Sequence, residues 1–251
     1  CVLSITVVFY SLSTLSNAVL PSIAGTYIQG DIVGTNQKVD KAVHTTMIIA
    51  IPAAVGLAAL SIPIVRLLFP QKESLLQAAG LLSVLSITVV FYSLSTLSNA
   101  VLQGIGKVNM PVINASISLV IQTVFLVVIL LTTNMNLYGL AAASIIYSFL
   151  MCLFNGISIH KSLGYKQNMM KCYFIPLLSS LIMGAVAGLV YMGLFSLIRR
   201  NAISLFAAIF CGALLYFVLM IKLRGISKSE IESLPKGKLI VKVIIKEMVK
   251  S

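Results

Sequence analysis

The sequence predicts an all-α fold, a polytopic membrane bundle of about seven transmembrane helices. Of its 251 residues, 59% are hydrophobic and only 10% are charged, whereas a soluble domain carries about 25% charged residues. The mean hydropathy of +1.05 indicates a chain whose natural solvent is lipid. The apolar residues form long runs, without the alternation over about 10 residues that marks the strands of a membrane barrel.

A helix needs about 20 apolar residues to cross the hydrocarbon core of a membrane. The chain contains seven runs of this kind, with Gly, Pro and Asn at their ends. We therefore predict a transmembrane bundle over residues 1–224, with spans at 2–28, 43–69, 78–102, 108–132, 137–159, 173–198 and 202–223. Residues 225–251 are predicted to form a separate cytoplasmic tail.

The first span contains a verbatim repeat. Residues 2–20, VLSITVVFYSLSTLSNAVL, recur unchanged at 84–102. Structural repeats within membrane proteins are weak similarities rather than identical copies. The repeat therefore indicates a recent duplication of DNA or a misjoined sequence. We interpret 84–102 as native and the earlier segment as the copy, and we draw no function from it.

The second span contains Pro52, which predicts a kink or a freed backbone carbonyl in its helix. The last three spans carry small residues four positions apart, a spacing that lets two helices approach closely. These residues are Gly139 with Ala143, Ser180 with Gly184 and Gly188, and Ala208 with Gly212. We interpret them as packing positions rather than as ligand contacts.

The basic residues are distributed unevenly between the two sides of the predicted bundle. Fourteen of the 18 lysines and arginines follow spans one, three and five or lie in the tail, and the other four are Arg66, Lys72, Arg199 and Arg200. Because cytoplasmic loops of membrane proteins are enriched in basic residues, the first set and the C-terminus are predicted to be cytoplasmic. The net charge of +12 is then a sign of topology, and we predict no nucleic-acid partner.

The tail has a basic amphipathic pattern. Lys238, Lys242, Lys246 and Lys250 recur at every fourth position, with apolar residues between them. Such a helix suits the anionic lipids of an inner leaflet. A helix that pairs with another protein is the alternative.

Two predicted helices carry polar faces inside the membrane. Asn99 and Gln103 continue a face of the third span that begins at Thr88, and the fourth span carries Asn114, Ser118 and Gln122. These side chains are candidates to line an aqueous or sugar-binding cavity. The alternative is that they form hydrogen bonds between helices, worth about 0.6 kcal/mol each in a membrane. The sequence leaves both interpretations open, and the second is favoured.

No arrangement of residues suggests an enzyme. We find no catalytic Ser/His/Asp set, no paired carboxylates and no spacing typical of a metal site, and we expect no cofactor. The four cysteines show no paired spacing. All six acidic residues fall in predicted loops or the tail, whereas ion-coupled carriers usually place an ionisable group within the bilayer.

Three segments carry a resemblance to a known family. They are LPSIAGTYIQGD at 20–31, AIPAAVGLAALSIPIVRLLFP at 50–70 and LQGIGKVNMPVINASISLV at 102–120. They resemble the C-terminal half of the polysaccharide-biosynthesis flippases in the multidrug/oligosaccharidyl-lipid/polysaccharide exporter superfamily. That group includes stage V sporulation protein B and the lipid II flippase. The tail sequence SKSEIESLPKGKLI at 227–240 is similar to the sporulation branch.

The resemblance implies a fold and a function. The family has fourteen helices in two lobes around a central cavity, so the seven spans would be its last seven helices, and an N-terminal half would be missing. The implied cargo is an undecaprenyl-linked saccharide or a lipid II-like peptidoglycan precursor, carried across a bacterial cytoplasmic membrane. Arg66 matches a basic position of the family, where it would meet the cargo's pyrophosphate or anchor to lipid phosphates. We expect the chain alone not to transport.

Two other functions remain open at this point. One is a drug or cation antiporter of the same superfamily. The other is a membrane scaffold for cell-wall or spore assembly that transports nothing. The absence of an acidic residue in the predicted spans disfavours the antiporter, and the two polar faces disfavour the scaffold.

Overall fold

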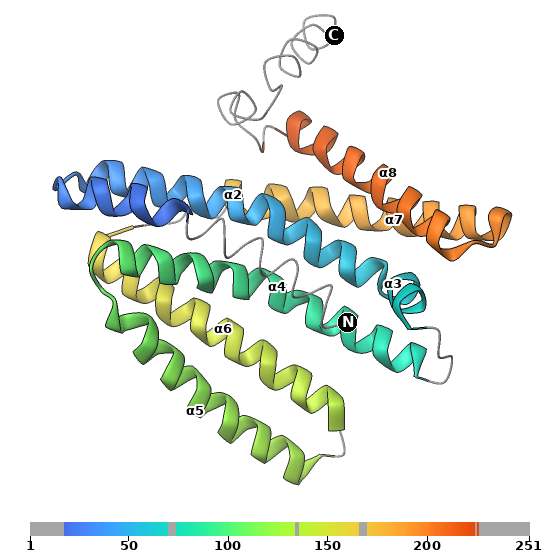
Figure 1. Cartoon of the computed structure of the whole chain (residues 1–251), viewed down its shortest axis with the longest axis horizontal. Helices are drawn as coiled ribbons and strands as arrows, with labels where there is room; N and C mark the ends of the chain where they lie inside the picture. The colour runs from blue at the N-terminus through green and yellow to red at the C-terminus, as the bar shows by residue number, and fades with distance from the viewer. Residues whose placement is uncertain (1–17, 70–73, 134–135, 166–169, 224, 226–251) are drawn as a thin grey trace, which may run out of the picture.

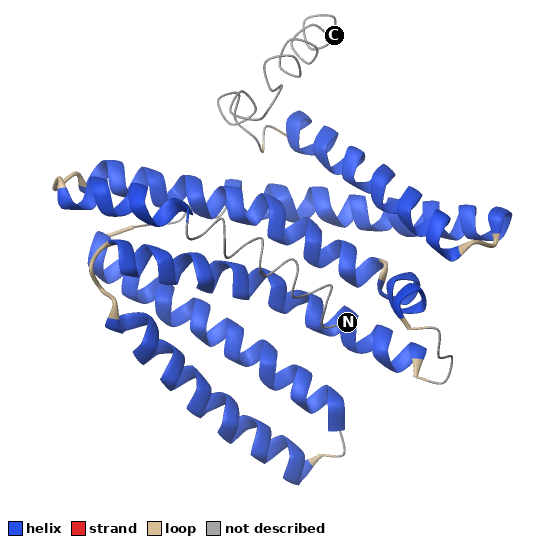
Figure 2. Cartoon of the chain, viewed as in Figure 1, coloured by secondary structure: helices blue, strands red, loops and turns tan. Residues whose placement is uncertain are grey.

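A computed structural model describes residues 18–69, 74–133, 136–165, 170–223 and 225. Within these ranges the chain is helical and forms no strand (Figure 2), so the predicted all-α membrane bundle is confirmed. The N-terminal 17 residues, which hold most of the repeat copy, lie outside the described part. So does the predicted amphipathic helix of the tail.

Six of the described helices are long and apolar enough to cross a membrane. They are α2 (Ile32–Ala59), α4 (Leu75–Gly104), α5 (Asn109–Thr132), α6 (Asn136–Leu163), α7 (Ile175–Ile198) and α8 (Asn201–Lys222). Three shorter elements accompany them, namely a helix at Ala18–Ile28, α3 (Ser61–Leu68) and the π-helical turn η1 (Met170–Phe174). The predicted first span is described only over Ala18–Ile28.

The long helices follow one another in space in an order that differs from the sequence. Helix α6 packs between α5 and α4, α4 also packs on α2, and α2 in turn packs on α7, which carries α8 (Figure 1). The short α3 contacts both α4 and α8. Helices that are distant in sequence therefore meet through α2, α3 and α6, and the polar contacts described below lie at these junctions.

Helix α2 begins earlier than the sequence predicted. The apolar run starts near residue 43, but the helix starts at Ile32 because Asp31 caps it, with its Oδ1 accepting a hydrogen bond of 2.8 Å from the backbone N–H of Gly34. Such a cap satisfies a backbone donor that the first turn leaves unpaired. Residues 32–42, which we predicted to be a loop, are therefore helical.

The predicted second span is divided between two helices. Helix α2 continues through Pro52 and ends at Ala59, and α3 starts at Ser61. Pro63 accounts for the break at Leu60, because its nitrogen cannot donate to the carbonyl of Ala59 and its ring would clash with that carbonyl. The break lets α3 take its own direction at the end of the bundle.

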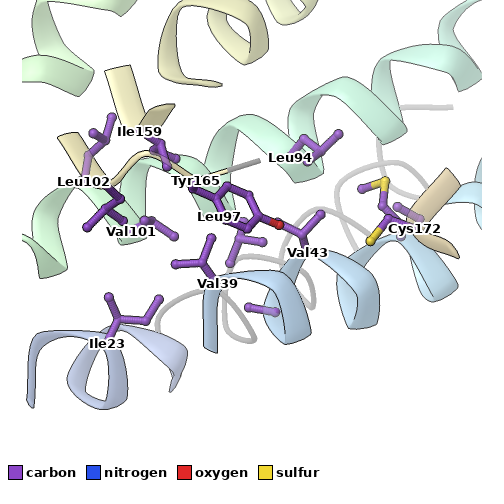
Figure 3. Packing of buried hydrophobic residues seen from close by; sticks show 14 of the residues in the cluster. Ile23, Val39, Val43, Leu94, Leu97, Val101, Leu102, Ile159, Tyr165 and Cys172 are labelled. Carbon is purple, nitrogen blue, oxygen red and sulfur yellow. The ribbon is translucent and has the colours of Figure 1, made fainter. Parts of the chain in front are cut away.

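The main apolar core lies where α2, α4 and α6 meet. Val39 and Val43 of α2 pack with Leu97 and Val101 of α4 and with Ile159 of α6 (Figure 3). The four-residue spacing of these positions aligns them on one face of α2 and on one face of α4. Many other large apolar side chains on the helices are exposed, as expected for surfaces that face lipid.

Helix α5 is the long helix least buried by its neighbours. Its buried residues are Pro111, Asn114 and Ser118, while Val120 is 63% exposed and Leu131 is 81% exposed. Two of the three buried residues are polar, so α5 offers little apolar surface to the rest of the bundle. Hydrogen bonds from these polar residues therefore contribute to its attachment.

Candidate functional site

A network of buried side-chain amides joins α4, α5 and α6. Its centre is Asn155 of α6, which is fully buried. The Nδ2 of Asn155 donates to the Oδ1 of Asn99 at 2.7 Å and to the backbone oxygen of Ser95 at 3.3 Å. Both acceptors belong to α4, so a single amide links α6 to the polar face that the sequence predicted there.

The same amide also holds α5. The Nδ2 of Asn114 donates to the Oδ1 of Asn155 at 2.9 Å and to the Oγ of Ser158 at 3.1 Å. On α5 itself, the Oγ of Ser118 donates to the backbone oxygen of Asn114 at 2.8 Å. Asn155 thus uses both its donors and its acceptor, which removes the cost of burying an amide in an apolar region.

The predicted polar residues fall into two groups. Asn99 and Asn114 come together through Asn155, and Ser118 is fully buried beside them. Gln103 is exposed near the end of α4 and Gln122 is half-buried on α5, and neither side chain has a hydrogen-bond partner among the described residues. The observed bonds support the packing interpretation for Asn99 and Asn114. A role in a cavity stays a prediction for the set.

Asn155 and Ser158 are not among the residues that the sequence pattern predicts. The only local signal was an asparagine in the middle of the apolar run LFNGIS, at residues 153–158. A lone amide gives no periodic pattern, but its cost in lipid indicates that it has a partner. That partner could not be named from the sequence, because it lies on other helices.

Cavities lie between the described helices, and two of them adjoin α4. One, of about 530 Å³, is bounded by α2, α4 and α6 and lined by Leu97, Val101, His160, Lys161 and Tyr165 among others. The other, of about 650 Å³, is almost wholly apolar and lies between α2, α4 and α7. Neither cavity is lined by Arg66 or by any of the five predicted polar residues of α4 and α5.

Tyr165 is one of the residues that line the first cavity. Its hydroxyl donates to the Oδ1 of Asp40 at 2.8 Å, and its backbone oxygen lies 2.8 Å from the Nδ1 of His160. One turn before Asp40, the Nδ2 of Asn36 donates to the backbone oxygen of Leu163 at 3.2 Å. Burial and the neighbouring Asp40 carboxylate raise the pKa of Tyr165. The start of α2 is thus fastened to the end of α6.

Arg66 lies on α3, beyond the C-terminal end of α2, and its side chain is exposed. Its guanidinium carbon is 5.3 Å from the centre of the Phe195 ring, and its Nη1 is 3.5 Å from the hydroxyl of Tyr191. Both aromatic residues belong to α7. Arg66 is therefore separated from the amide network, and the predicted site residues do not form a single site.

The described residues contain no group of three His, Cys, Asp or Glu side chains that could hold a metal ion. The described residues form six membrane-length apolar helices, joined at three junctions by buried or partly buried polar contacts. This arrangement defines a multi-pass membrane protein built as a helical bundle.

The family model described as "Lipid II flippase MurJ" matches residues 7–225, so the chain belongs to the MurJ lipid II flippase family. The lipid II flippase MurJ of Bacillus subtilis (strain 168) is 30% identical over 178 residues, which are 68% of this chain and 31% of that protein. The probable lipid II flippase MurJ of Aquifex aeolicus (strain VF5) is 31% identical over 189 residues, which are 73% of this chain and 36% of that protein.

These matches confirm the predicted family and make the chain a multi-pass bacterial membrane protein. The chain spans about a third of the length of the two relatives, as their covered shares of 31% and 36% show. The similarity to the sporulation branch stays a prediction.

Proposed function

We propose that the chain is part of a flippase that moves a lipid-linked peptidoglycan precursor from the inner to the outer leaflet of the cytoplasmic membrane. The observation that carries this proposal is the family match over residues 7–225. The cargo would be lipid II or a similar undecaprenyl-linked saccharide. The chain would act as a transporter rather than as an enzyme, with no cofactor.

The proposed orientation places the first turns of α2 and the end of α6 in the cytoplasm. Lys38 and Lys41 on α2 and Lys161 on α6 lie at this end of the bundle, whereas Arg66, Arg199 and Arg200 lie at the other end. The basic tail would then also be cytoplasmic, where its lysines could bind anionic lipids. This orientation is the one predicted from the sequence.

The amide network would contribute to transport by keeping α5 in place. Helix α5 has few buried apolar residues, so the bonds from Asn114 to Asn155 and Ser158 set its position against α6. Gln103 and Gln122 remain candidates to contact a sugar, because their amides are unused within the described residues. No observation favours the antiporter or the scaffold over the flippase.

A test of the function uses a bacterial strain depleted of its own lipid II flippase. The chain is expressed alone and together with the N-terminal half of a full-length family member, and precursor exposed on the outer surface is measured. We expect translocation with both parts and none with the chain alone, because the family builds its cavity from two lobes. No translocation with both parts inserted would refute the proposal, and transport by the chain alone would refute the two-part arrangement.

A further inference from the structure

Three exposed arginines gather at the end of the bundle that we propose to face outward. Arg66 lies on α3, and Arg199 and Arg200 form the turn between α7 and α8. The acidic residues that the structure describes, Asp31 and Asp40, lie at the other end of α2, a helix of about 42 Å at 1.5 Å per residue. The three positive charges therefore have no carboxylate near them within the described residues.

A chain of three hydrogen bonds connects Arg66 to this turn. The Nη1 of Arg66 is 3.5 Å from the hydroxyl of Tyr191, which itself donates to the Oδ1 of Asn201 at 2.8 Å. The Nδ2 of Asn201 then donates to the backbone oxygen of Pro63 at 3.0 Å. These bonds lead from Arg66 of α3 to α7, from α7 to α8, and from α8 back to Pro63 of α3, three residues before Arg66.

The guanidinium is also supported by an aromatic stack. Phe195 lies under it at 5.3 Å from ring centre to guanidinium carbon, and the Phe195 ring is stacked on Tyr191 with centres 5.6 Å apart. A guanidinium has five N–H donors, and among the described residues only the one toward Tyr191 is engaged. The other donors of the planar guanidinium have no partner in the described part of the chain, an arrangement that suits the oxygens of a phosphate.

The surface around the arginines is apolar. Leu67 and Leu68 on α3 are 42% and 43% exposed, and Ile198 and Phe206, on α7 and α8, are 43% and 65% exposed. A free phosphate would leave these side chains uncovered. A phospholipid carries both the phosphate that the arginines can bind and the acyl chains that can cover the apolar residues.

We propose that Arg66, together with the α7–α8 turn, binds the phosphate of a membrane phospholipid. The bound headgroup would join α3 to α7 and α8 at the membrane interface and hold the break at Leu60 in one geometry. This proposal requires only that the chain lies in a membrane. It is independent of the cargo and of the orientation, so its failure would leave the flippase function untouched.

The chain has no tryptophan, which allows a test that reports on this site alone. A single tryptophan replaces Leu67 in the full chain, which is reconstituted in galactosyl-diacylglycerol vesicles containing phosphatidylglycerol with brominated acyl chains. Bromine quenches tryptophan only at contact distance, so the quenching measures the phospholipid beside Arg66. A single tryptophan at the exposed Leu131 of α5, which lies away from the arginines, reports the bulk lipid.

We expect phosphatidylglycerol to be about fivefold more abundant beside the tryptophan of Leu67→Trp than beside that of Leu131→Trp. This enrichment is of the size that the strength of an exposed ion pair can produce. Arg66→Gln should abolish the enrichment. Phe195→Leu, which keeps the charge but removes the stack, should reduce it, and Arg66→Lys should retain part of it. Lys107→Gln, at the other end of the bundle, is the matched control and should change nothing.

Two results would overturn the assignment. The first is equal quenching at both reporters, or an enrichment that survives Arg66→Gln. The second is a loss of quenching when undecaprenyl pyrophosphate is added at a tenth of the phosphatidylglycerol concentration, which tests the source of the phosphate. Relief of the quenching by this small amount would assign the arginines to a pyrophosphate lipid instead of a resident phospholipid, whereas unchanged quenching supports the phospholipid.

Discussion

The side-chain amide of Asn155 donates a hydrogen bond of 2.7 Å to the side-chain oxygen of Asn99, which joins α6 to α4 in the interior of the bundle. Because Asn155 also accepts from Asn114 of α5, three helices meet at one amide. Lipid provides little apolar driving force for helices to associate. A shared polar residue is therefore an effective way to specify which helices pack together.

We predict that Asn155→Leu destabilises the bundle by about 2 kcal/mol, since it removes three hydrogen bonds of about 0.6 kcal/mol each and leaves partners unpaired. For a chain of this size the loss corresponds to a fall in Tm of about 4–8 °C. The measurement is thermal denaturation of the purified chain in detergent.

Gln122→Leu is the control for this change, because it replaces an amide of α5 that has no hydrogen-bond partner in the described chain. Asn114→Leu should lie between the two, since it removes only the bonds to Asn155 and Ser158. Equal Tm values for all three variants would show that the amides do not hold the helices together. If Asn114→Leu then abolished transport by the two parts expressed together, at unchanged stability, the cavity interpretation would be favoured.

The sequence predicts the fold class well because crossing a membrane imposes a length and a composition on each helix. It predicts helix ends poorly, as α2 shows. Its first turns carry Lys38, Asp40 and Lys41, which lower the hydropathy without ending the helix. The true start depends on the cap at Asp31, a local feature that a search for apolar runs does not detect.

The candidate site is predicted only in part for a different reason. Asn99 and Asn114 were identified because they belong to periodic polar faces, but their common partner, Asn155, stands alone in an apolar run. Likewise the aromatic partners of Arg66, Tyr191 and Phe195 of α7, are more than a hundred positions away. Periodicity shows which face of a helix is polar, but the partner of that face depends on the packing of the whole bundle.

Two glycines of α7 should respond in opposite ways to replacement by alanine. A Cβ on Gly184 would lie 2.8 Å from the Cγ1 of Val55, whereas one on Gly188 would meet nothing within 4 Å. Valine is stiff at its branched carbon, so Gly184→Ala forces α7 and α2 apart, at a cost of about 1–3 kcal/mol for overpacking. Gly188→Ala should raise stability by about 0.4–1 kcal/mol through reduced backbone freedom.

Thermal denaturation of the two glycine variants tests this directly. The close packing predicted from the sequence is confirmed at Gly184, whereas a Cβ on Gly188 would meet no atom of the described residues within 4 Å. A higher Tm for Gly184→Ala than for Gly188→Ala would contradict the contact between α7 and α2.

The orientation predicts which loops are accessible from outside the cell. In a chain with its four native cysteines replaced, a single cysteine at Thr133, exposed after α5, should react with a membrane-impermeant maleimide on intact cells. A single cysteine at Lys107, exposed between α4 and α5, should react only after the membrane is permeabilised. The reverse pattern would invert the proposed topology, because one helix separates the two positions.

Tyr165 should make the stability of the chain depend on alkaline pH. Burial, and to a smaller extent Asp40, raises the pKa of Tyr165 in the folded chain, whereas an unfolded tyrosine ionises at about pH 10. The folded state therefore favours the neutral phenol, and the stability that this provides is complete below about pH 10 and is lost as the pH rises above it. Tyr165→Phe cannot ionise, so its stability should fall less steeply than that of the wild type between about pH 10 and 11.5.

At neutral pH the same variant loses only the hydrogen bond to Asp40, which corresponds to about 1 kcal/mol. The measurement is Tm against pH for the wild type, Tyr165→Phe and Tyr27→Phe, whose hydroxyl makes no hydrogen bond within the described residues. The wild type and Tyr27→Phe should follow the same curve. If Tyr165→Phe followed it as well, ionisation of the Tyr165 phenol would not weaken the contact between the start of α2 and the end of α6.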